Sequence, residues 1–508
     1  MNTPEMLYSL LLLVAALATG GRGATIDVPG DYSSIQDAIN AASDGDSVLV
    51  QPGTYLEHDL DFGGRAITVT GTAPEDSAVV AATLIDAEGQ GRGFEFDQGE
   101  GASSVVSGLS ITGGTDSRDG GGVFCFYASP TFIRCFITNN SAGWDGAGVF
   151  GDLSSATFER CIFADNQAGR RGGGVFLEAG APSMVDCRSV RNSASNGGGF
   201  YLLNSQATVT DCLISDNSVN ASGGGIYCST GAPTLTRCRI LGNTGGDDGG
   251  GIHCGSSTAS LSNCYIADNS IGDDGGGVFC GTAGAPAFMN CTITANSASE
   301  GGGSYLWNAT STFTNCILWG NSPDAIVEDG STATVTYSDV EGTWPGEGNI
   351  GVDPELFLGD FHLQSNSPCI NTGTSVGAPQ EDLDGDPRPI GFEVDIGADE
   401  QIPLGLEGNA PNPPSAAVAS LGTPSPNPFN PRVEIPYELH VATRHRIAVY
   451  GIRGDLVRVL VDASRPAGSH RIGWNGMNEK GAPVASGVYH LSLETSSRTL
   501  TRKLLLLK

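Results

Sequence analysis

Aromatic residues recur at intervals of 25 or 26 residues through the middle of this sequence, each close behind a glycine-rich stretch. A row of outward-facing rings is a surface on which proteins hold sugars, since each ring offers a broad apolar contact. The sequence therefore predicts a carbohydrate-binding stripe, with Tyr201, Tyr227, His253, Phe279 and Tyr305 as its binding residues. The whole row comprises Phe124, Phe150, Phe176, Tyr201, Tyr227, His253, Phe279 and Tyr305.

A second interpretation of the same row needs no ligand. Stacked aromatic rings stabilise a parallel sheet by about 0.5–1.5 kcal/mol per pair. In both interpretations we expect His253 to fill a position in the row and not to ligate a metal ion.

Acidic residues crowd the turns before three successive glycine triplets. Carboxylates ~4.8 Å apart in a stack repel by roughly 1–3.5 kcal/mol per pair, and a bound cation would relieve the repulsion. Oxygen-only clusters suit Ca²⁺, so the sequence predicts an optional calcium site and no required cofactor. The alternative is a solvated acidic loop whose repulsion is screened by salt. The candidate ligands are Asp247, Asp248, Asp273, Asp274 and Glu300.

These turns lack a base for catalysis. The segment Gly249 to Gly303 contains no Lys or Arg. Arg170 and Arg171 lie in the equivalent turn three coils away, ~14 Å along the axis of a stack. Groups that act on one bond must both reach it, so we predict no catalytic residue.

The elements that carry these residues form a repeat of 25 to 27 residues, found eight times between Gly120 and Asn321. Each unit reads G-G-G-[VI]-[FY], then an alternating Thr/Ser stretch, then C-x-[IFL]-x-x-N, with small departures. One such unit cannot bury its apolar face alone, whereas a stack of them builds a continuous core. The period-two alternation predicts an all-β solenoid with three short parallel strands per coil.

Equivalent cysteines and asparagines mark every coil. The chain has 13 Cys, and a shared position in each coil favours ladders of buried free thiols over disulfides, because stacked side chains point the same way. The asparagine ends the third strand, where it can hydrogen-bond the equivalent residues above and below. The eight pairs are Cys135/Asn140, Cys161/Asn166, Cys187/Asn192, Cys212/Asn217, Cys238/Asn243, Cys264/Asn269, Cys291/Asn296 and Cys316/Asn321.

The repeat unit resembles the coils of right-handed parallel β-helices of the pectin-lyase-like class, including the repeats of chlamydial polymorphic outer-membrane proteins. The resemblance covers roughly residues 25–400. It implies a β-helix at 25–340 and a closing segment at 341–400. Within the β-helix, Ile35, Ala38, Ile39 and Ala42 recur at helical spacing behind Ser33 and Ser34, which predicts an N-terminal capping helix at 32–42. Asp382, Asp384 and Asp386 in that segment are expected to be structural turn residues. The glycine-histidine-glycine and arginine-isoleucine-lysine strings of polygalacturonase-like enzymes are absent.

The ends of the chain have other signatures. Residues 1–24 read as a signal peptide, because a short apolar run precedes small residues. Residues 401–424 are rich in Pro, Ala, Gly and Ser and predict a linker. Residues 425–508 alternate like short antiparallel strands and resemble the hook-cap type Ig-like sandwich that serves as a sorting domain in Por-type (type IX) secretion. That resemblance implies an export address read by the secretion machinery.

Charge narrows the function classes. The net charge is −31, and residues 425–508 carry 12 Lys+Arg against 6 Asp+Glu, so the remaining chain is strongly acidic. Such a body repels nucleic acid, and no later segment is apolar enough for a transmembrane helix. We predict a bacterial protein, extracellular or on the outer-membrane surface, that binds polysaccharide or another cell-surface component in the manner of an adhesin. The alternatives are a polysaccharide lyase or glycoside hydrolase, and a purely structural surface fibre.

Overall fold

The computed structural model describes residues 23–357, 360–401, 419–422, 424–427, 429–439, 443–451, 456–466, 468–495 and 499–506. The chain divides between Pro403 and Leu404 into two compact units. The predicted signal peptide lies outside the described residues, apart from its last two positions. No helix among the described residues is long and apolar enough to cross a membrane.

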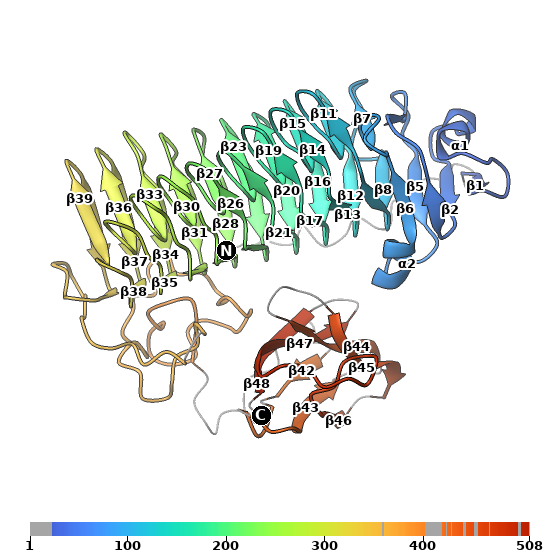
Figure 1. The fold of residues 1–508 in the computed structure, drawn as a ribbon. Helices are drawn as coiled ribbons and strands as arrows, with labels where there is room; N and C mark the ends of the chain where they lie inside the picture. Colours follow the sequence, from blue (N-terminus) through green and yellow to red (C-terminus); the bar gives the residue numbers. More distant parts are fainter. Residues whose placement is uncertain are drawn as a thin grey trace, which may run out of the picture. The chain divides into compact units, whose positions relative to one another are not determined.

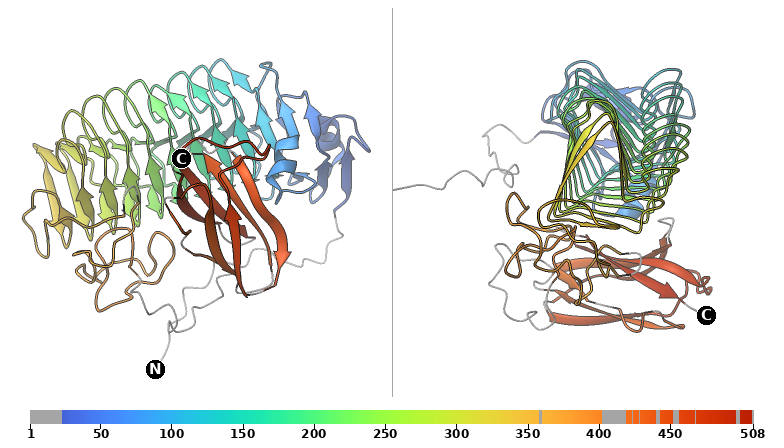
Figure 2. Two further views of the ribbon diagram at one scale, coloured as in Figure 1. Left: turned by 60° about the horizontal axis from the view of Figure 1, so that its bottom comes forward. Right: turned by 90° about the vertical axis from the view of Figure 1, so that its left-hand side faces the viewer.

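The first unit is a parallel β-solenoid of three long sheets, called A, B and C here, and a short sheet D. Figure 1 shows the coils side by side along the axis, and the right-hand view of Figure 2 looks along the stack. Each regular coil contributes one strand to each long sheet, in the order C, A, B along the chain. The all-β fold with three strands per coil is therefore confirmed.

Sheet A consists of β1 (Thr25–Val28), β2 (Ser47–Val50), β5 (Thr68–Gly71), β8 (Val105–Ser107), β12 (Thr131–Ile133), β16 (Thr157–Glu159), β20 (Ser183–Val185), β24 (Thr208–Thr210), β28 (Thr234–Thr236), β31 (Ser260–Ser262), β34 (Ala287–Met289), β37 (Thr310–Thr314) and β40 (Thr332–Thr336). Sheet B consists of β3 (Gly53–Tyr55), β6 (Thr83–Asp86), β9 (Ser110–Thr112), β13 (Phe136–Thr138), β17 (Ile162–Ala164), β21 (Arg188–Val190), β25 (Leu213–Ser215), β29 (Arg239–Leu241), β32 (Tyr265–Ala267), β35 (Thr292–Thr294), β38 (Ile317–Trp319) and β41 (Asp339–Val340).

Sheet C consists of β4 (Leu60–Asp61), β7 (Phe94–Phe96), β11 (Val123–Phe126), β15 (Val149–Asp152), β19 (Val175–Glu178), β23 (Phe200–Leu203), β27 (Ile226–Cys228), β30 (Ile252–Cys254), β33 (Val278–Cys280), β36 (Ser304–Trp307) and β39 (Ile326–Asp329). Sheet D consists of the two-residue strands β10 (Thr115–Asp116), β14 (Ser141–Ala142), β18 (Gln167–Ala168), β22 (Ser193–Ala194) and β26 (Ser218–Val219). Two residues carry no readable alternation, so sheet D could not be predicted from the pattern.

Each coil contributes one set of apolar side chains to the core. In the coil that starts at β11, Val123, Phe132, Cys135 and Ile137 are all fully buried. The following coil places Val149, Phe158, Cys161 and Phe163 in register with them, again buried. All thirteen cysteines are free and buried, as expected for thiol ladders.

A ladder of buried asparagines runs along the turn after sheet B. Asn243 is typical: its Oδ1 accepts the backbone N–H of Asn217 at 3.0 Å and the Nδ2 of Asn217 at 2.9 Å. Its own Nδ2 donates to the Ile214 carbonyl at 3.0 Å and to Asn269 Oδ1 at 2.9 Å. The predicted stacking of these residues is confirmed, and it satisfies the buried backbone groups of a turn that would otherwise be unpaired.

Two helices flank the first coils. The helix α1 (Ile35–Ala41) begins at Ser34, whose side chain accepts the Asp37 N–H, and it buries Ile35 and Ile39 against the solenoid. This is the predicted capping helix, which covers strand edges that would otherwise be exposed. The helix α2 (Ser77–Ala82) was not expected from the sequence.

The closing segment runs along the outside of sheet B. Asn290 Nδ2 donates to the Asp395 carbonyl at 3.1 Å, and Ala398 N donates to Thr292 Oγ1 at 3.0 Å. Tyr265 of β32 packs with Phe361, Leu383 and Ala398. The Asp382 carboxylate accepts the N–H groups of Asp384, Asp386 and Glu400, which is the structural turn role predicted for it.

The second unit is a two-sheet antiparallel structure. One sheet contains β42 (Ala419–Leu421), β43 (Val433–Leu439) and β46 (Gly468–Trp474), and the other contains β44 (Thr443–Gly451), β45 (Leu456–Arg465), β47 (Gly487–Thr495) and β48 (Thr499–Leu506). Its core includes Phe429, Trp474 and Leu491. The strand β42 falls within the stretch 401–424 assigned to a linker. With Leu421 as its one large apolar residue, it carries too little pattern to be recognised.

Candidate functional site

The predicted aromatic row lies on the outer face of sheet C as a continuous stack, which we call the aromatic ladder (Phe124, Phe150, Phe176, Tyr201, Tyr227, His253, Phe279 and Tyr305). Neighbouring ring centres are 4.1–5.8 Å apart and the ring planes differ by 5–24°. The rings therefore cover each other's faces. Phe124 and Tyr227 are half-buried, and the other six rings are buried, from Phe176 with no exposed surface to Phe150 and Tyr305 at 8%. This geometry matches the sheet-stabilising interpretation of the row, and sugar stacking on these ring faces would require the stack to open.

His253 sits inside this ladder, between Tyr227 at 4.1 Å and Phe279 at 4.8 Å. Burial lowers the pKa of its imidazole to about 4, so the ring is neutral at pH 7. Its Nδ1 has no hydrogen-bond partner. The histidine fills a stacking position, as expected from the sequence.

The tyrosines offer a polar edge. Within the described residues, the hydroxyl groups of Tyr227 and Tyr305 make no hydrogen bond with the protein. Burial, aided by Tyr201 and Asp248, raises the pKa of Tyr227 to about 12, so the phenol stays protonated and can donate. These hydroxyls can bond to a polar ligand that lies along the ladder.

A second outward column runs beside the ladder, two residues further along each strand of sheet C. It starts at Phe126, whose register partner in the next coil is Asp152, and it reaches Trp307, whose partner is Asp329. Phe126 is 38% exposed and Trp307 is 45% exposed. No aromatic ring of this column stacks on either of them. Phe126 lies 6.4 Å from the Phe124 ring and meets the Tyr127 ring nearly at right angles at 4.5 Å, so only part of its surface is open.

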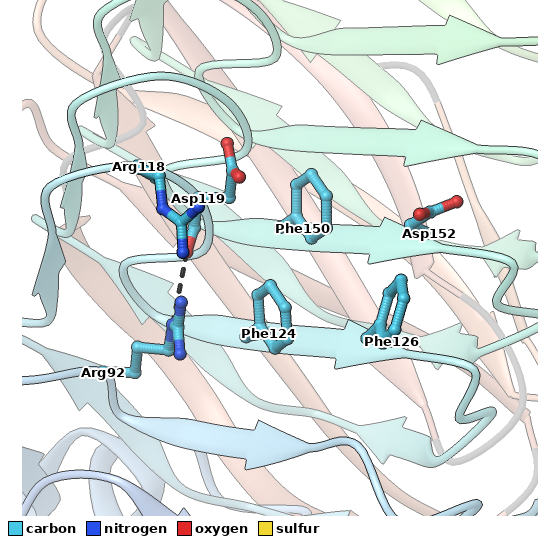
Figure 3. A pocket seen from close by; sticks show the side chains of 7 residues that line it. All are labelled: Arg92, Arg118, Asp119, Phe124, Phe126, Phe150 and Asp152. Carbon is cyan, nitrogen blue, oxygen red and sulfur yellow. Dashed lines mark hydrogen bonds between the residues drawn. The ribbon is translucent and has the colours of Figure 1, made fainter.

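A shallow pocket of about 340 Å³ surrounds Phe126. Figure 3 shows Phe124 and Phe126 on one strand, Phe150 and Asp152 on the next, and two arginines beside them. The pocket is lined by Arg92, Arg118, Asp119, Phe124, Phe126, Phe150 and Asp152.

Charged groups frame this pocket. The Arg92 guanidinium lies 4.1 Å from the centre of the Phe124 ring and 3.0 Å from Glu95. Burial raises the pKa of the Asp152 carboxyl. Burial and the neighbouring Asp145 raise the pKa of Asp119. The pocket thus combines aromatic surface with hydrogen-bonding groups of both signs, a lining suited to a polar ligand with an apolar face.

The residues before the glycine triplets form a polar column on the other side of the ladder. Arg171 interrupts this column. Its guanidinium donates to both carboxylate oxygens of Asp145, from Nε at 3.0 Å and from a terminal nitrogen at 2.5 Å. Further along, Asp274 and Glu300 are register neighbours, and the Asp273 N–H donates to the Asp247 carbonyl.

The acidic turn thus brings the candidate calcium ligands into adjacent coils. Burial, together with Asp274, Asp273 and Asp247, raises the pKa of Asp248 to about 6. No group of three metal-ligating side chains within reach of one ion occurs in the described part of the chain. Calcium binding stays a prediction, which melting curves in calcium and in chelator test.

Comparison with known families decides the fold family. The family described as "Right handed beta helix region" matches residues 76–212 and again 188–340, together more than half of the chain. The chain belongs to the right-handed β-helix family. A second family, the FlgD Ig-like domain, matches residues 437–499. No curated protein matches the chain.

Solved structures similar to this β-helix protein are distant. The pectin methylesterase from Aspergillus niger in deglycosylated form is 13% identical, with a TM-score of 0.21, covering 66% of this chain and 87% of that one. The siphovirus 9NA tailspike receptor binding domain is 10% identical, with a TM-score of 0.19, covering 94% of this chain and 98% of that one. Likeness at this level carries no conclusion about activity.

Sequence reasoning missed the exposed aromatics of this β-helix. Phe126 and Trp307 each follow a ladder aromatic by two residues, so period-two alternation places them on the same outer face. That signal was available for both. Their exposure could not be predicted from the sequence, because it depends on the side chains packed around each ring.

Proposed function

We propose that this β-helix protein binds polysaccharide, without cleaving it, along the outer face of sheet C and parallel to the solenoid axis. The observation that carries the proposal is the pair of exposed aromatic residues in one column of that face, Phe126 and Trp307, which we call the platforms. They lie seven coils apart, which is roughly 34 Å at the spacing of stacked strands. An extended glycan could stack one sugar on each ring, because the C–H face of a pyranose packs against aromatic surface.

The aromatic ladder contributes its edge to the same surface. In register, Tyr201, Tyr227, His253 and Phe279 lie on coils between the two platforms, and Tyr305 shares its strand with Trp307. The unpartnered hydroxyls of Tyr227 and Tyr305 supply hydrogen bonds to sugar hydroxyls. Phe279 and His253 hold the stack that positions them.

A binding assay tests this function. Soluble polysaccharides are titrated into wild type, Phe126→Ala/Trp307→Ala and Tyr227→Phe/Tyr305→Phe. Phe392→Ala is the control, because Phe392 is 98% exposed in the closing segment. We expect the platform variant to lose binding by about tenfold or more and the hydroxyl variant by a smaller factor, with the control unchanged. Equal binding by all four proteins would refute binding on the outer face of sheet C.

Hydrolysis or elimination is the second candidate function. It is favoured by the Asp248 carboxyl, whose pKa of about 6 suits a general acid. Release of reducing or unsaturated ends over a day from wild type, but not from Asp248→Asn/Asp274→Asn, would establish an enzyme. We expect no release from either protein.

We also propose that the protein is displayed outside a bacterial cell and that residues 425–508 direct its export. Their match to an Ig-like family and their positive charge, opposite to that of the remaining chain, support a separate role for this unit. Cells that express a truncation lacking 425–508 are fractionated. Retention of the truncated solenoid inside the cell is expected, and unchanged surface display would refute the sorting role.

A purely structural fibre remains the third alternative. It predicts that no polysaccharide binds wild type while the folded solenoid is unaffected by the platform substitutions. The binding assay and the release assay together therefore separate the three functions.

A further inference from the structure

Three residues occupy equivalent backbone positions in the turns of three successive coils, beside the N-terminal half of the aromatic ladder. They are Arg118, Trp144 and Arg170, called the Arg–Trp–Arg column here. The Trp144 N–H donates to the Arg118 carbonyl at 2.6 Å, and the Arg170 N–H donates to the Trp144 carbonyl at 2.8 Å. One residue per coil gives a column that spans two coil spacings, or roughly 10 Å.

All three side chains are accessible. Trp144 is 44% exposed, and both arginines are exposed. The Arg170 guanidinium lies 5.6 Å from the centre of the Trp144 ring. This contact holds the tryptophan in place and leaves an indole surface open to the outside.

The two arginines make no ion pair within the described residues, although carboxylates are close. Asp145, next to Trp144, has both oxygens occupied by Arg171. Asp116 accepts the backbone N–H groups of Arg118 and Asp119 at 2.7 and 3.1 Å and lies 3.6 Å from Arg92.

Asp116 and Asp145 are thus engaged elsewhere. The charge of Arg118 acts on Asp119, where it partly offsets the rise that burial causes in the pKa of that carboxyl, but the two side chains form no ion pair, so the charges of Arg118 and Arg170 stay available. In a chain with a net charge of −31, two unpaired cations on either side of an exposed indole are an uncommon arrangement.

We propose that the Arg–Trp–Arg column binds an acidic sugar, one that carries a carboxylate or sulfate group, within the polysaccharide. Each guanidinium can hold an oxyanion through paired N–H donors, and the indole face packs against the sugar ring between them. The proposal rests on the proposed function, because it assigns the chemistry of the glycan that lies on this face.

The remainder of the face sets the orientation of the acidic unit. Arg118 also lines the pocket around Phe126, so the column continues into the platform at that end. At the other end, Asp248, Asp274 and Glu300 border the ladder and repel anions. The acidic units of the glycan therefore bind at the coils of Arg118 to Arg170, and uncharged units bind toward Trp307.

The test compares four probes: alginate for carboxylate, dextran sulfate for sulfate, dextran for a neutral glycan and polyglutamate for a polyanion without sugar. Affinities are measured for wild type and Arg118→Ala/Arg170→Ala at two salt concentrations. Arg134→Ala/Arg160→Ala is the control, because it removes the same charge elsewhere on the solenoid. Arg134 and Arg160 occupy equivalent positions in two successive coils, where they pair with Glu75 and Glu159. Melting curves of each variant confirm that it is folded.

We expect wild type to prefer one acidic glycan over dextran and polyglutamate, and Arg118→Ala/Arg170→Ala to bind that glycan about tenfold more weakly. The control variant keeps the wild-type affinity, and added salt weakens binding because the contact is ionic. Binding quenches tryptophan fluorescence in wild type and less in Trp144→Phe.

Three outcomes would overturn the inference: no preference of wild type for an acidic glycan, equal losses in the two arginine variants, or equal affinity for polyglutamate. Dextran binding that depends on Phe126 and Trp307 would then leave the proposed function standing. Absence of binding to every glycan would refute both.

Discussion

At the scale of single residues, the solenoid depends on side chains that satisfy the backbone of the neighbouring coil. Asn243 serves four groups at once: the N–H and Nδ2 of Asn217, the carbonyl of Ile214 and the Oδ1 of Asn269. All of these are buried, so none can turn to water when the asparagine is removed. A buried group left without its partner costs about 1–3 kcal/mol.

We predict that Asn243→Ala lowers the free energy of unfolding by about 3 kcal/mol or more. Asn220→Ala is the matched control, because Asn220 is exposed in the turn after Asn217, one coil before Asn243, and should change stability by less than about 0.5 kcal/mol. Urea unfolding of the two variants measures the difference. Similar losses would show that the ladder does not carry stability.

Asp248 in the acidic turn is expected to make the stability of the solenoid depend on pH. Its pKa in the folded protein, about 6, lies above the ordinary value of 3.8 because the half-buried charged form is disfavoured. Its contribution to stability is therefore complete below pH 4 and is lost as pH rises through 6. We predict that Asp248→Asn melts above wild type at pH 7.5, by the equivalent of about 1 kcal/mol after solvent screening, and like wild type at pH 4.5.

Asp324→Asn provides the control for this pH comparison, since Asp324 is exposed in a later coil. Its melting temperature should follow that of wild type at both pH values. A constant gap between Asp248→Asn and wild type across the pH range would contradict the assignment of the raised pKa to Asp248.

At the scale of elements, strands of three residues persist only because neighbours and a closing segment cover them. The closing segment is pinned to sheet B by a chain of charges. Arg239 of β29 contacts Asp384 at 2.9 Å, and His362 lies between Asp384 at 2.7 Å and Asp360 at 2.9 Å. These contacts overcome desolvation and raise the pKa of His362 to about 10, so the imidazole is charged at neutral pH.

We predict that His362→Gln loosens this segment and speeds amide exchange at Phe361–Gln364 by about tenfold or more, with little change in the coils before β29. His58→Gln is the control, because His58 pairs with Asp59 at an exposed site. The stabilisation from His362 is complete below its unfolded pKa near 6.5 and is lost as pH rises through 10. Exchange rates that match wild type at pH 7 would show that the charges do not hold the segment.

The repeated elements were predictable from sequence and the unrepeated ones were not. Val123, Phe132, Cys135 and Asn140 recur at one spacing, so eight copies reinforce each inference about which side chain points inward. The path of residues 341–400 has no such redundancy. It depends on single contacts, such as Asn290 with the Asp395 carbonyl, between residues about one hundred positions apart.

The candidate site was predictable in part for the same reason. The ladder positions followed from the repeat, but their mutual stacking depends on side-chain packing across coils. Arg118, Trp144 and Phe126 break the repeat, and a sequence pattern does not distinguish such departures from neutral variation.

At the scale of the whole molecule, the chain joins two units with separate cores. The core of the solenoid and that of the second unit share no residue. We predict that residues 23–403 and 404–508, expressed separately, each melt cooperatively within about 2 °C of their transitions in the full chain. Calorimetry of the two pieces and the full chain makes the comparison. An unfolded 404–508 fragment would show that this unit needs the solenoid.

The most direct test of the binding surface is the dependence of affinity on glycan length. Oligosaccharides of two to twelve sugars, cut from the polysaccharide that binds best, are titrated into wild type and Trp307→Ala. A ligand that lies along the axis must reach from Phe126 to Trp307, roughly 34 Å over seven coils. Affinity for wild type should therefore keep rising until the chain spans both platforms, and Trp307→Ala should stop gaining at shorter lengths. Affinity that levels off at two or three sugars, equally in both proteins, would contradict binding along this face.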